Sequence, residues 1–133
     1  HTNKIIGIKE ASGNLEQIKQ LIAMSKEQKG KNSTPLLIIS GDDGIACEVM
    51  KAGGAGLISV ASNAFPDDFR RIVHEQDEAL QAQYDKMVKL LFAEGNPVGI
   101  KAVLTQKEII QNYLRLPLVP ASENLTNNIK ALL

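Results

Sequence analysis

Two lysines in the same tripeptide are the residues whose type could perform nucleophilic chemistry. Gly7-Ile8-Lys9 closes an apolar run, whereas Gly99-Ile100-Lys101 follows Asn96-Pro97. Removing an ammonium group from water lowers its pKa, and the neutral amine can attack a carbonyl to form a Schiff base. A lysine at the end of a buried strand can therefore be a nucleophile, but such a lysine more commonly extends into solvent. The pattern alone leaves both interpretations of Lys9 open.

Lys101 is expected to be an ordinary charge. It lies about one turn into the helix that Asn96-Pro97 is expected to begin, with Asn96 as the cap and Pro97 in the first turn. A lysine at such a position is usually solvated or salt-bridged. The two identical tripeptides are therefore predicted to occur in different backbones.

The segment Gly41-Asp42-Asp43-Gly44 follows a second apolar run. Paired carboxylates could act as acid and base or hold a hard cation. Side chains that are neighbours in sequence seldom converge, however, and one aspartate is expected to cap the helix before Ile45. Gly41 is the more informative residue, because a glycine at a strand end lets the backbone approach a ligand closely.

The remaining candidate motifs favour structural roles. The glycines of Gly53-Gly54-Ala55-Gly56 precede a strand, which indicates a tight helix-to-strand turn rather than a phosphate loop, and neither GxGxxG nor GxxxxGK[ST] is present. His74 lies among charged residues and is expected to be exposed. Cys47 is expected to be a small packing residue. The sequence therefore offers no support for a serine or cysteine triad.

The elements that must position Lys9 and Gly41 repeat in strand–helix order. Unalternated apolar runs at 5–8, 36–39 and 57–60 predict parallel strands covered on both faces. Amphipathic helices separate them, one starting at Leu15 and one after the aspartates, and the polar segment 26–34 is expected to be a helix end and surface loop. This order predicts a parallel sheet with right-handed crossovers.

After Phe65-Pro66 the pattern becomes helical. Helices are predicted at 67–79, at 80–93 with an apolar stripe, from Asn96-Pro97 to about residue 113, and after Ser122, with 115–120 extended. The predicted fold class is α/β: three strands from the C-terminal part of a (β/α)8 TIM barrel plus a helical extension. Residues 1–64 would be the last βα units, and residues 65–133 the closing barrel helix and the extension. Because such a barrel takes about 250 residues, and the chain starts at His1, a piece of a longer protein is expected.

The composition excludes several function classes. The 15 basic and 15 acidic residues balance, and the basic ones do not cluster into a surface for nucleic acid or anionic membranes. No run approaches the ~20 apolar residues that span a bilayer. The single cysteine excludes an internal disulfide and a cysteine-based zinc cluster. A cytoplasmic location is expected, with no metal and no cofactor.

Five segments together carry a resemblance to a known family. GIKEASGNL, LLIISGDD, AGLISVASN, NPVGIKAVL and LRLPLVP occur in this order and spacing. They resemble the dihydrodipicolinate synthase family, which belongs to the pyruvate-dependent class I aldolase superfamily together with N-acetylneuraminate lyase. The resemblance covers essentially the whole chain but only the C-terminal part of the family's length.

The resemblance implies a role for each candidate residue. Lys9 would bind pyruvate as a Schiff base, Gly41 would line the pocket and Ile58 would contact the bound pyruvate. Asp42 would be a candidate contact for the second substrate, L-aspartate-4-semialdehyde. The condensation would yield 4-hydroxy-tetrahydrodipicolinate, the precursor of diaminopimelate and lysine, and the SGDD segment favours this reaction over the neuraminate lyases.

The family's other functional residues have no counterpart in this chain. Its carboxylate-binding threonines, catalytic tyrosine, semialdehyde-binding arginine and lysine feedback site all lie in the earlier part. Because a Schiff base also needs proton transfer, the chain alone is expected to be inactive and to require the missing N-terminal part of the barrel. The resemblance also implies a homotetramer built as a dimer of dimers. Two alternatives stay open: a related pyruvate aldolase acting on a sugar-like aldehyde, and a non-catalytic half-barrel that serves oligomer contacts.

Overall fold

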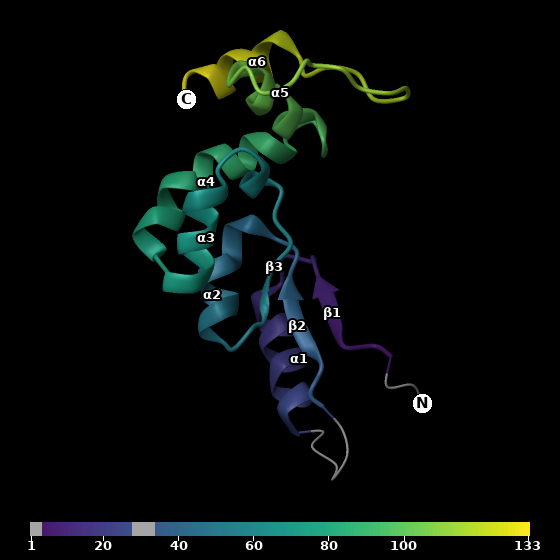
Figure 1. The fold of residues 1–133 in the computed structure, drawn as a ribbon, viewed down its shortest axis with the longest axis vertical. Coiled ribbons are helices and arrows are strands. Elements are labelled where there is room, and N and C mark those ends of the chain that lie inside the picture. Colours follow the sequence, from purple (N-terminus) through teal and green to yellow (C-terminus); the bar gives the residue numbers. More distant parts are fainter. Residues whose placement is uncertain (1–3, 28–33) are drawn as a thin grey trace.

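A computed structural model describes residues 4–27 and 34–133 of the chain, so His1 and most of the polar segment 26–34 lie outside the described residues. Three short strands form a parallel sheet in the order β1–β2–β3 (Figure 1). The strands and their connections are β1 (Gly7–Glu10), α1 (Leu15–Glu27), β2 (Leu37–Ser40), the 3-10 turn η1 (Asp43–Ile45), α2 (Ala46–Lys51) and β3 (Gly56–Leu57). The predicted repetition of strand and helix is confirmed.

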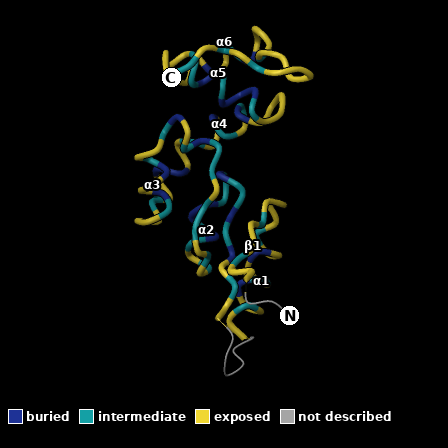
Figure 2. The backbone as a smooth tube through the Cα atoms, turned by 45° about the vertical axis from the view of Figure 1, so that its right-hand side comes forward, coloured by how far each residue is buried: buried dark blue, intermediate teal, exposed yellow. Residues whose placement is uncertain are grey.

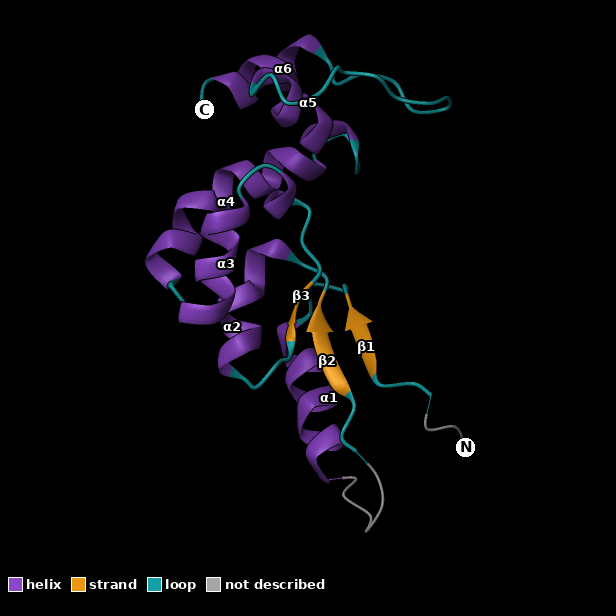
Figure 3. Cartoon of the chain, in the orientation of Figure 1, coloured by secondary structure: helices purple, strands orange, loops and turns teal. Residues whose placement is uncertain are grey.

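The two faces of this sheet have different surroundings. Ile38 of β2 is buried together with Ile18 and Ile22 of α1 and Val49 of α2, so both helices cover the same face (Figure 3). Each buried aliphatic side chain of this kind contributes about 1.5–3 kcal/mol. Because strand side chains alternate between faces, Ile39 points to the opposite face, where no described helix covers it.

Strand β1 differs from its prediction in position and in burial. The strand begins at Gly7 rather than Ile5 and continues to Glu10, so Lys9 lies within it. The expectation that both faces are covered is wrong for this chain, because Ile6 is 73% exposed and Ile8 is also exposed. The physical reason is that β1 forms one edge of the described sheet and pairs only with β2.

Strand β3 is shorter than the predicted strand at 57–60. It ends at Leu57, and the chain then enters the 3-10 turn η2 (Ala61–Asn63). The backbone N–H groups of Val60 and Ala61 donate to the Asp43 carboxylate instead of to a neighbouring strand. The turn before β3 is as predicted: Gly53 has a positive φ of 98°, which favours glycine.

The helices after β3 begin and end at other residues than predicted. Helix α3 covers Pro66–Glu75 and α4 covers Glu78–Phe92. They are separated because Gln76 adopts a left-handed conformation (φ 55°) and Asp77 caps α4 by accepting the Leu80 N–H at 2.9 Å. The predicted apolar stripe of α4 is buried or half-buried, at Leu80, Tyr84, Met87, Val88 and Leu91.

The C-terminal segment contains two more helices, α5 (Val98–Gln106) and α6 (Glu123–Lys130). The prediction that Asn96 caps α5 is wrong, since Pro97 precedes the helix without a side-chain cap bond. Helix α5 also ends at 106 rather than near 113. The segment predicted to be extended contains a turn, in which the Leu118 N–H donates to the Arg115 carbonyl at 3.0 Å. Ser122 caps α6 as predicted, by accepting the Leu125 N–H at 3.1 Å.

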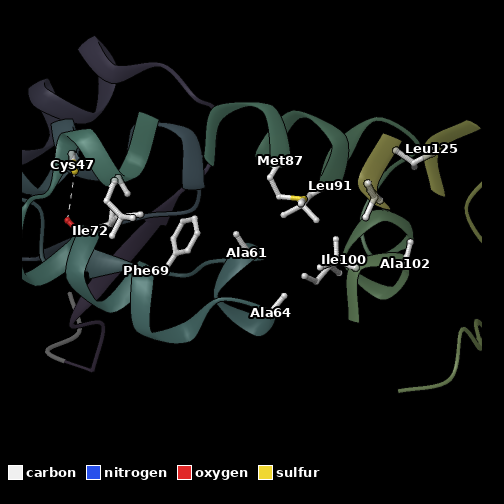
Figure 4. Close-up of a cluster of buried hydrophobic side chains, with 14 residues drawn as sticks. Cys47, Ala61, Ala64, Phe69, Ile72, Met87, Leu91, Ile100, Ala102 and Leu125 are labelled. Atoms are coloured by element: carbon white, nitrogen blue, oxygen red, sulfur yellow. Dashed lines mark hydrogen bonds between the residues drawn. The ribbon is translucent and has the colours of Figure 1, made fainter. Parts of the chain in front are cut away.

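The larger hydrophobic core lies among the helices and not beneath the sheet. Figure 4 shows how Ile72 and Phe69 of α3, Met87 and Leu91 of α4 and residues of α5 and α6 pack into one cluster. The cluster includes Cys47 of α2, which is fully buried and packs among its neighbours as predicted. The burial colouring in Figure 2 follows the same distribution, with exposed chain along the long segment between α5 and α6. No described helix is both long enough and apolar enough to cross a membrane.

Candidate active site

Lys9 and Gly41 lie against each other across two strands. In the parallel register Lys9 pairs with Ile39, so both side chains leave the sheet on the face opposite to α1 and α2. The Cε atom of Lys9 lies only 2.6 Å from the point that a Cβ atom on Gly41 would occupy. The lysine therefore extends over the carboxyl end of β2, and only a glycine at position 41 leaves room for it there.

Ile58 belongs to the same face. Ser40 pairs with Leu57, and the Ile58 N–H donates to the Ser40 carbonyl at 2.8 Å, which continues the strand pairing by one residue. Leu57 packs against the helical core, so by alternation Ile58 points to the side of Lys9. Its side chain is 50% exposed. The carboxyl ends of the three strands thus bring together Lys9, Gly41 and Ile58, at the edge where parallel α/β folds commonly bind their ligands.

Lys9 is exposed, and its carboxylate neighbour turns away from it. The Glu10 carboxylate accepts the Ser12 N–H at 2.6 Å and the Gln17 side-chain amide at 2.9 Å. The hydrogen bond from the Ser12 backbone is the main cause that lowers the pKa of Glu10. Both carboxylate oxygens of Glu10 are thus engaged by Ser12 and Gln17 rather than by Lys9. Because Lys9 is exposed, the described residues alone do not provide the desolvated environment that lowers the pKa of a lysine.

Asp42 acts as a local cap. Its Oδ1 accepts the Gly44 N–H at 2.8 Å at the start of η1, which confirms the capping interpretation. Its Oδ2 lies 3.0 Å from the ideal Cβ position of Gly13, in the loop after β1. Half-buried between two loops, Asp42 lies near the rim of the site with one oxygen already engaged.

Asp43 connects two parts of the rim, a role that the sequence pattern does not predict. Its Oδ2 accepts the N–H groups of Val60 at 2.9 Å and Ala61 at 3.1 Å, so its carboxylate joins the loop after β2 to the loop after β3. The only sequence signal was its place in SGDD, which suggested a cap for the adjacent helix. A partner 17 residues away could not be identified from local spacing.

The other chemically capable residues lie elsewhere. Lys101 is on α5, as predicted, but it is half-buried and donates to the Tyr113 carbonyl rather than being solvated or salt-bridged. His74 is exposed on α3 and lines, with Ser59 and Arg70, a shallow cavity of about 310 Å³ that does not include Lys9. Among residues 4–27 and 34–133, no three histidine, cysteine, aspartate or glutamate side chains are grouped to hold a metal ion.

The amino-acid sequence is similar to curated proteins that share one name. The 4-hydroxy-tetrahydrodipicolinate synthase of Porphyromonas gingivalis is 41% identical over 133 residues, which cover 94% of this chain and 42% of that protein. The enzyme of the same name from Phocaeicola vulgatus is 40% identical over 136 residues, covering 97% of this chain and 43% of that protein. The chain therefore spans less than half the length of these relatives.

Solved structures agree with the sequences. A monomeric dihydrodipicolinate synthase variant superposes with a TM-score of 0.87 at 32% identity, covering 96% of this chain and 43% of that one. A dihydrodipicolinate synthase from Acinetobacter baumannii, solved in complex with pyruvate, has a TM-score of 0.86 at 29% identity, with coverages of 96% and 44%. The described strands and helices are thus the C-terminal part of a (β/α)8 barrel with its helical extension, as predicted.

The family assignment does not depend on any single relative. The family model described as the dihydrodipicolinate synthetase family matches residues 1–133, which is the whole chain. The segments that carry the strand ends, GIKE and SGDD, are also those that bring Lys9 next to Gly41. With the sequence, the fold and the family model in agreement, this chain belongs to the dihydrodipicolinate synthetase family.

Proposed function

We propose that the protein to which this chain contributes condenses pyruvate with L-aspartate-4-semialdehyde to give 4-hydroxy-tetrahydrodipicolinate, in the biosynthesis of diaminopimelate and lysine. The observation that carries the proposal is the position of Lys9, whose Cε atom lies over Gly41 on the sheet face that Ile58 shares. The names of the relatives support the choice of reaction.

The amine of Lys9 is the proposed nucleophile. It attacks the keto carbon of pyruvate, water leaves and an imine forms. Loss of a proton from the adjacent methyl group converts the imine into an enamine. The enamine carbon then forms the new carbon–carbon bond with the aldehyde carbon of the semialdehyde. The amino group of the semialdehyde finally displaces Lys9 from the imine carbon, which closes the ring and frees the lysine.

The other site residues have supporting roles in this proposal. Gly41 and Ile58 line the position of the bound pyruvate, and Asp42 is a candidate contact for the second substrate. The proton transfers need an acid and a base. Among the described residues none hydrogen-bonds to Lys9, so we assign the proton-transferring groups to the N-terminal part of the barrel. The 133-residue chain alone is accordingly expected to be inactive.

The experiment that tests the proposal is trapping of the imine. The full-length protein that contains this chain is incubated with pyruvate and reduced with borohydride, and the adduct is mapped by mass spectrometry. We expect the adduct on Lys9, its loss in Lys9→Ala and its retention in Lys101→Ala, since the Lys101 amine bonds to the Tyr113 carbonyl. No adduct in the full-length protein would instead support a non-catalytic half-barrel.

The aldehyde is tested separately. With pyruvate saturating, the rate of condensation is compared between L-aspartate-4-semialdehyde and a sugar-like aldehyde such as N-acetylmannosamine. Faster turnover of the semialdehyde is expected. Preference for the sugar would keep the Schiff-base mechanism and replace the proposed reaction by that of a neuraminate lyase.

Location, assembly and domain division are further parts of the proposal. We place the reaction in the cytoplasm and the enzyme in a homotetramer, a dimer of dimers. One similar structure is described as a monomeric variant, so the state of assembly has to be measured for this protein by sedimentation of the full-length chain. The division between the last βα units (1–64) and the closing helix with its extension (65–133) also stays a prediction.

A further inference from the structure

Asp43 is the only carboxylate among the described residues that is buried, with 2% of its surface exposed. Buried carboxylates are normally paired or fully hydrogen-bonded, because their desolvation is costly. Both hydrogen bonds of Asp43 are made by Oδ2, to the N–H groups of Val60 and Ala61. Its Oδ1 is buried without a hydrogen-bond partner among the described residues. The carboxylate therefore binds one short stretch of backbone through Oδ2, although Oδ1 is left without a hydrogen bond from the described residues.

The contact between Asp43 and the backbone lies just past the end of the pairing between β2 and β3. Strands β2 and β3 pair at only two positions, Ile39 with Gly56 and Ser40 with Leu57, and the last backbone bond runs from the Ile58 N–H to the Ser40 carbonyl. Beyond Ile58, the Asp43 carboxylate rather than a strand carbonyl accepts the backbone N–H groups. It thereby joins the loop that begins with Gly41 to Val60 and Ala61, which follow Ile58 after one intervening residue.

We infer that Asp43 is a positioning residue for keto-acid binding: by holding the backbone at Val60 and Ala61, it sets the separation between Gly41 and Ile58 beside Lys9. The inference rests on the proposed function and extends it to a side chain that does not touch the substrate. A displacement of Ile58 changes how pyruvate fits against Lys9, so the effect is a weaker complex and slower imine formation, in addition to any loss of stability.

Three substitutions in the full-length protein separate positioning from stability. Asp43→Asn keeps the volume and one oxygen that can accept both N–H groups. Asp43→Leu removes the acceptor, and Asp43→Glu keeps the carboxylate but lengthens the side chain by one methylene group, which displaces the loop at residues 60–61. Asp77→Ala is the matched control, since it removes another carboxylate that caps a backbone N–H, at the start of α4.

The readouts are the melting temperature, the KM for pyruvate and the rate of borohydride-trapped imine. We expect Asp43→Leu and Asp43→Glu to raise the KM for pyruvate and slow trapping by about tenfold or more, Asp43→Asn to stay within about threefold of wild type, and Asp77→Ala to lower only the melting temperature. If Asp43→Leu does not fold, the pyruvate KM and trapping rate of Asp43→Glu are compared with those of Asp43→Asn, and this comparison tests the positioning role.

Each outcome has a definite meaning. Equal pyruvate KM and equal trapping rates in Asp43→Glu and Asp43→Asn would overturn the positioning role, whatever their melting temperatures. So would an Asp43→Leu variant that binds pyruvate like the wild type. If the wild-type protein itself forms no imine on Lys9, the proposed function fails first, and the two failures are thereby distinguished.

Discussion

Gly41→Ala is the substitution that tests the site geometry most directly. A Cβ atom at position 41 would lie 2.6 Å from the Lys9 Cε atom and 2.6 Å from the Ala11 Cβ atom. Carbon atoms in contact are separated by about 3.5–4.0 Å, so the Lys9 side chain has to move by about 1 Å. Because this side chain is exposed and flexible, it can move away at little energetic cost, and its amine then leaves the position over β2.

The expected consequence is a loss of reactivity that exceeds the loss of stability. A misplacement of about 1 Å at a reacting group can reduce the rate by about 10²-fold, so we expect imine trapping with pyruvate to slow by that order. The contact with Ala11 involves the backbone, whose Cα atom lies 3.2 Å from the new methyl group. Crowding of this kind lowers the free energy of unfolding by about 1–3 kcal/mol, which denaturant unfolding measures.

Gly44→Ala is the matched control in the same loop. Its added Cβ would lie 3.3 Å from the Asp42 Oδ1 atom and 4.0 Å from Val88, away from Lys9. Imine trapping by Gly44→Ala is expected to stay close to the wild-type rate. If Gly41→Ala traps pyruvate as fast as Gly44→Ala, Lys9 does not react from its position over Gly41, and the assigned geometry of the site is incorrect.

Two further predictions concern titratable groups outside the site. Burial raises the pKa of the Cys47 thiol, whose Sγ atom lies 3.6 Å from the Ile72 carbonyl oxygen; native protein at neutral pH should therefore resist a thiol reagent at Cys47, whereas unfolded protein should react fully. Rapid native labelling at Cys47 would contradict this. The hydroxyl and backbone N–H of Ser122 lower the pKa of Glu94, so this contact stabilises the folded state above the ordinary glutamate pKa and is lost as the pH falls through the lowered value. Glu94→Gln should weaken the acid-side dependence of the melting temperature on pH; an unchanged profile would show that the contact does not form in solution.

The helices show which structural features a local sequence pattern can predict and which it cannot. The apolar stripe of α4 and the Ser122 cap of α6 are visible in the sequence, because both depend on residues within one or two turns. The break between α3 and α4 was misplaced, since the left-handed Gln76 carries no strong sequence signal. The Asn96 cap was wrong for a similar reason: a residue type that favours caps does not ensure that its side chain makes the bond.

The ends and the burial of the strands are also only partly predictable from the local sequence. Apolar runs indicated where the three strands lie, but the strand ends differ from the predicted ones by one to three residues because pairing between strands decides which residues are included. The exposure of β1 could not be predicted from its own letters either. An apolar strand is buried only where other elements cover it, and within the described residues β1 is an edge strand.

The sequence by itself determined the residue types, the repeated strand–helix order and the family resemblance, because these depend on local periodicity and on motifs such as GIKE and SGDD. Only the tertiary structure decided that Lys9 lies over Gly41 and that Asp43 holds the backbone after Ile58. Both contacts join residues far apart in the chain, and their geometry follows from the register of the parallel strands. Spacing along a single strand carries no information about that register.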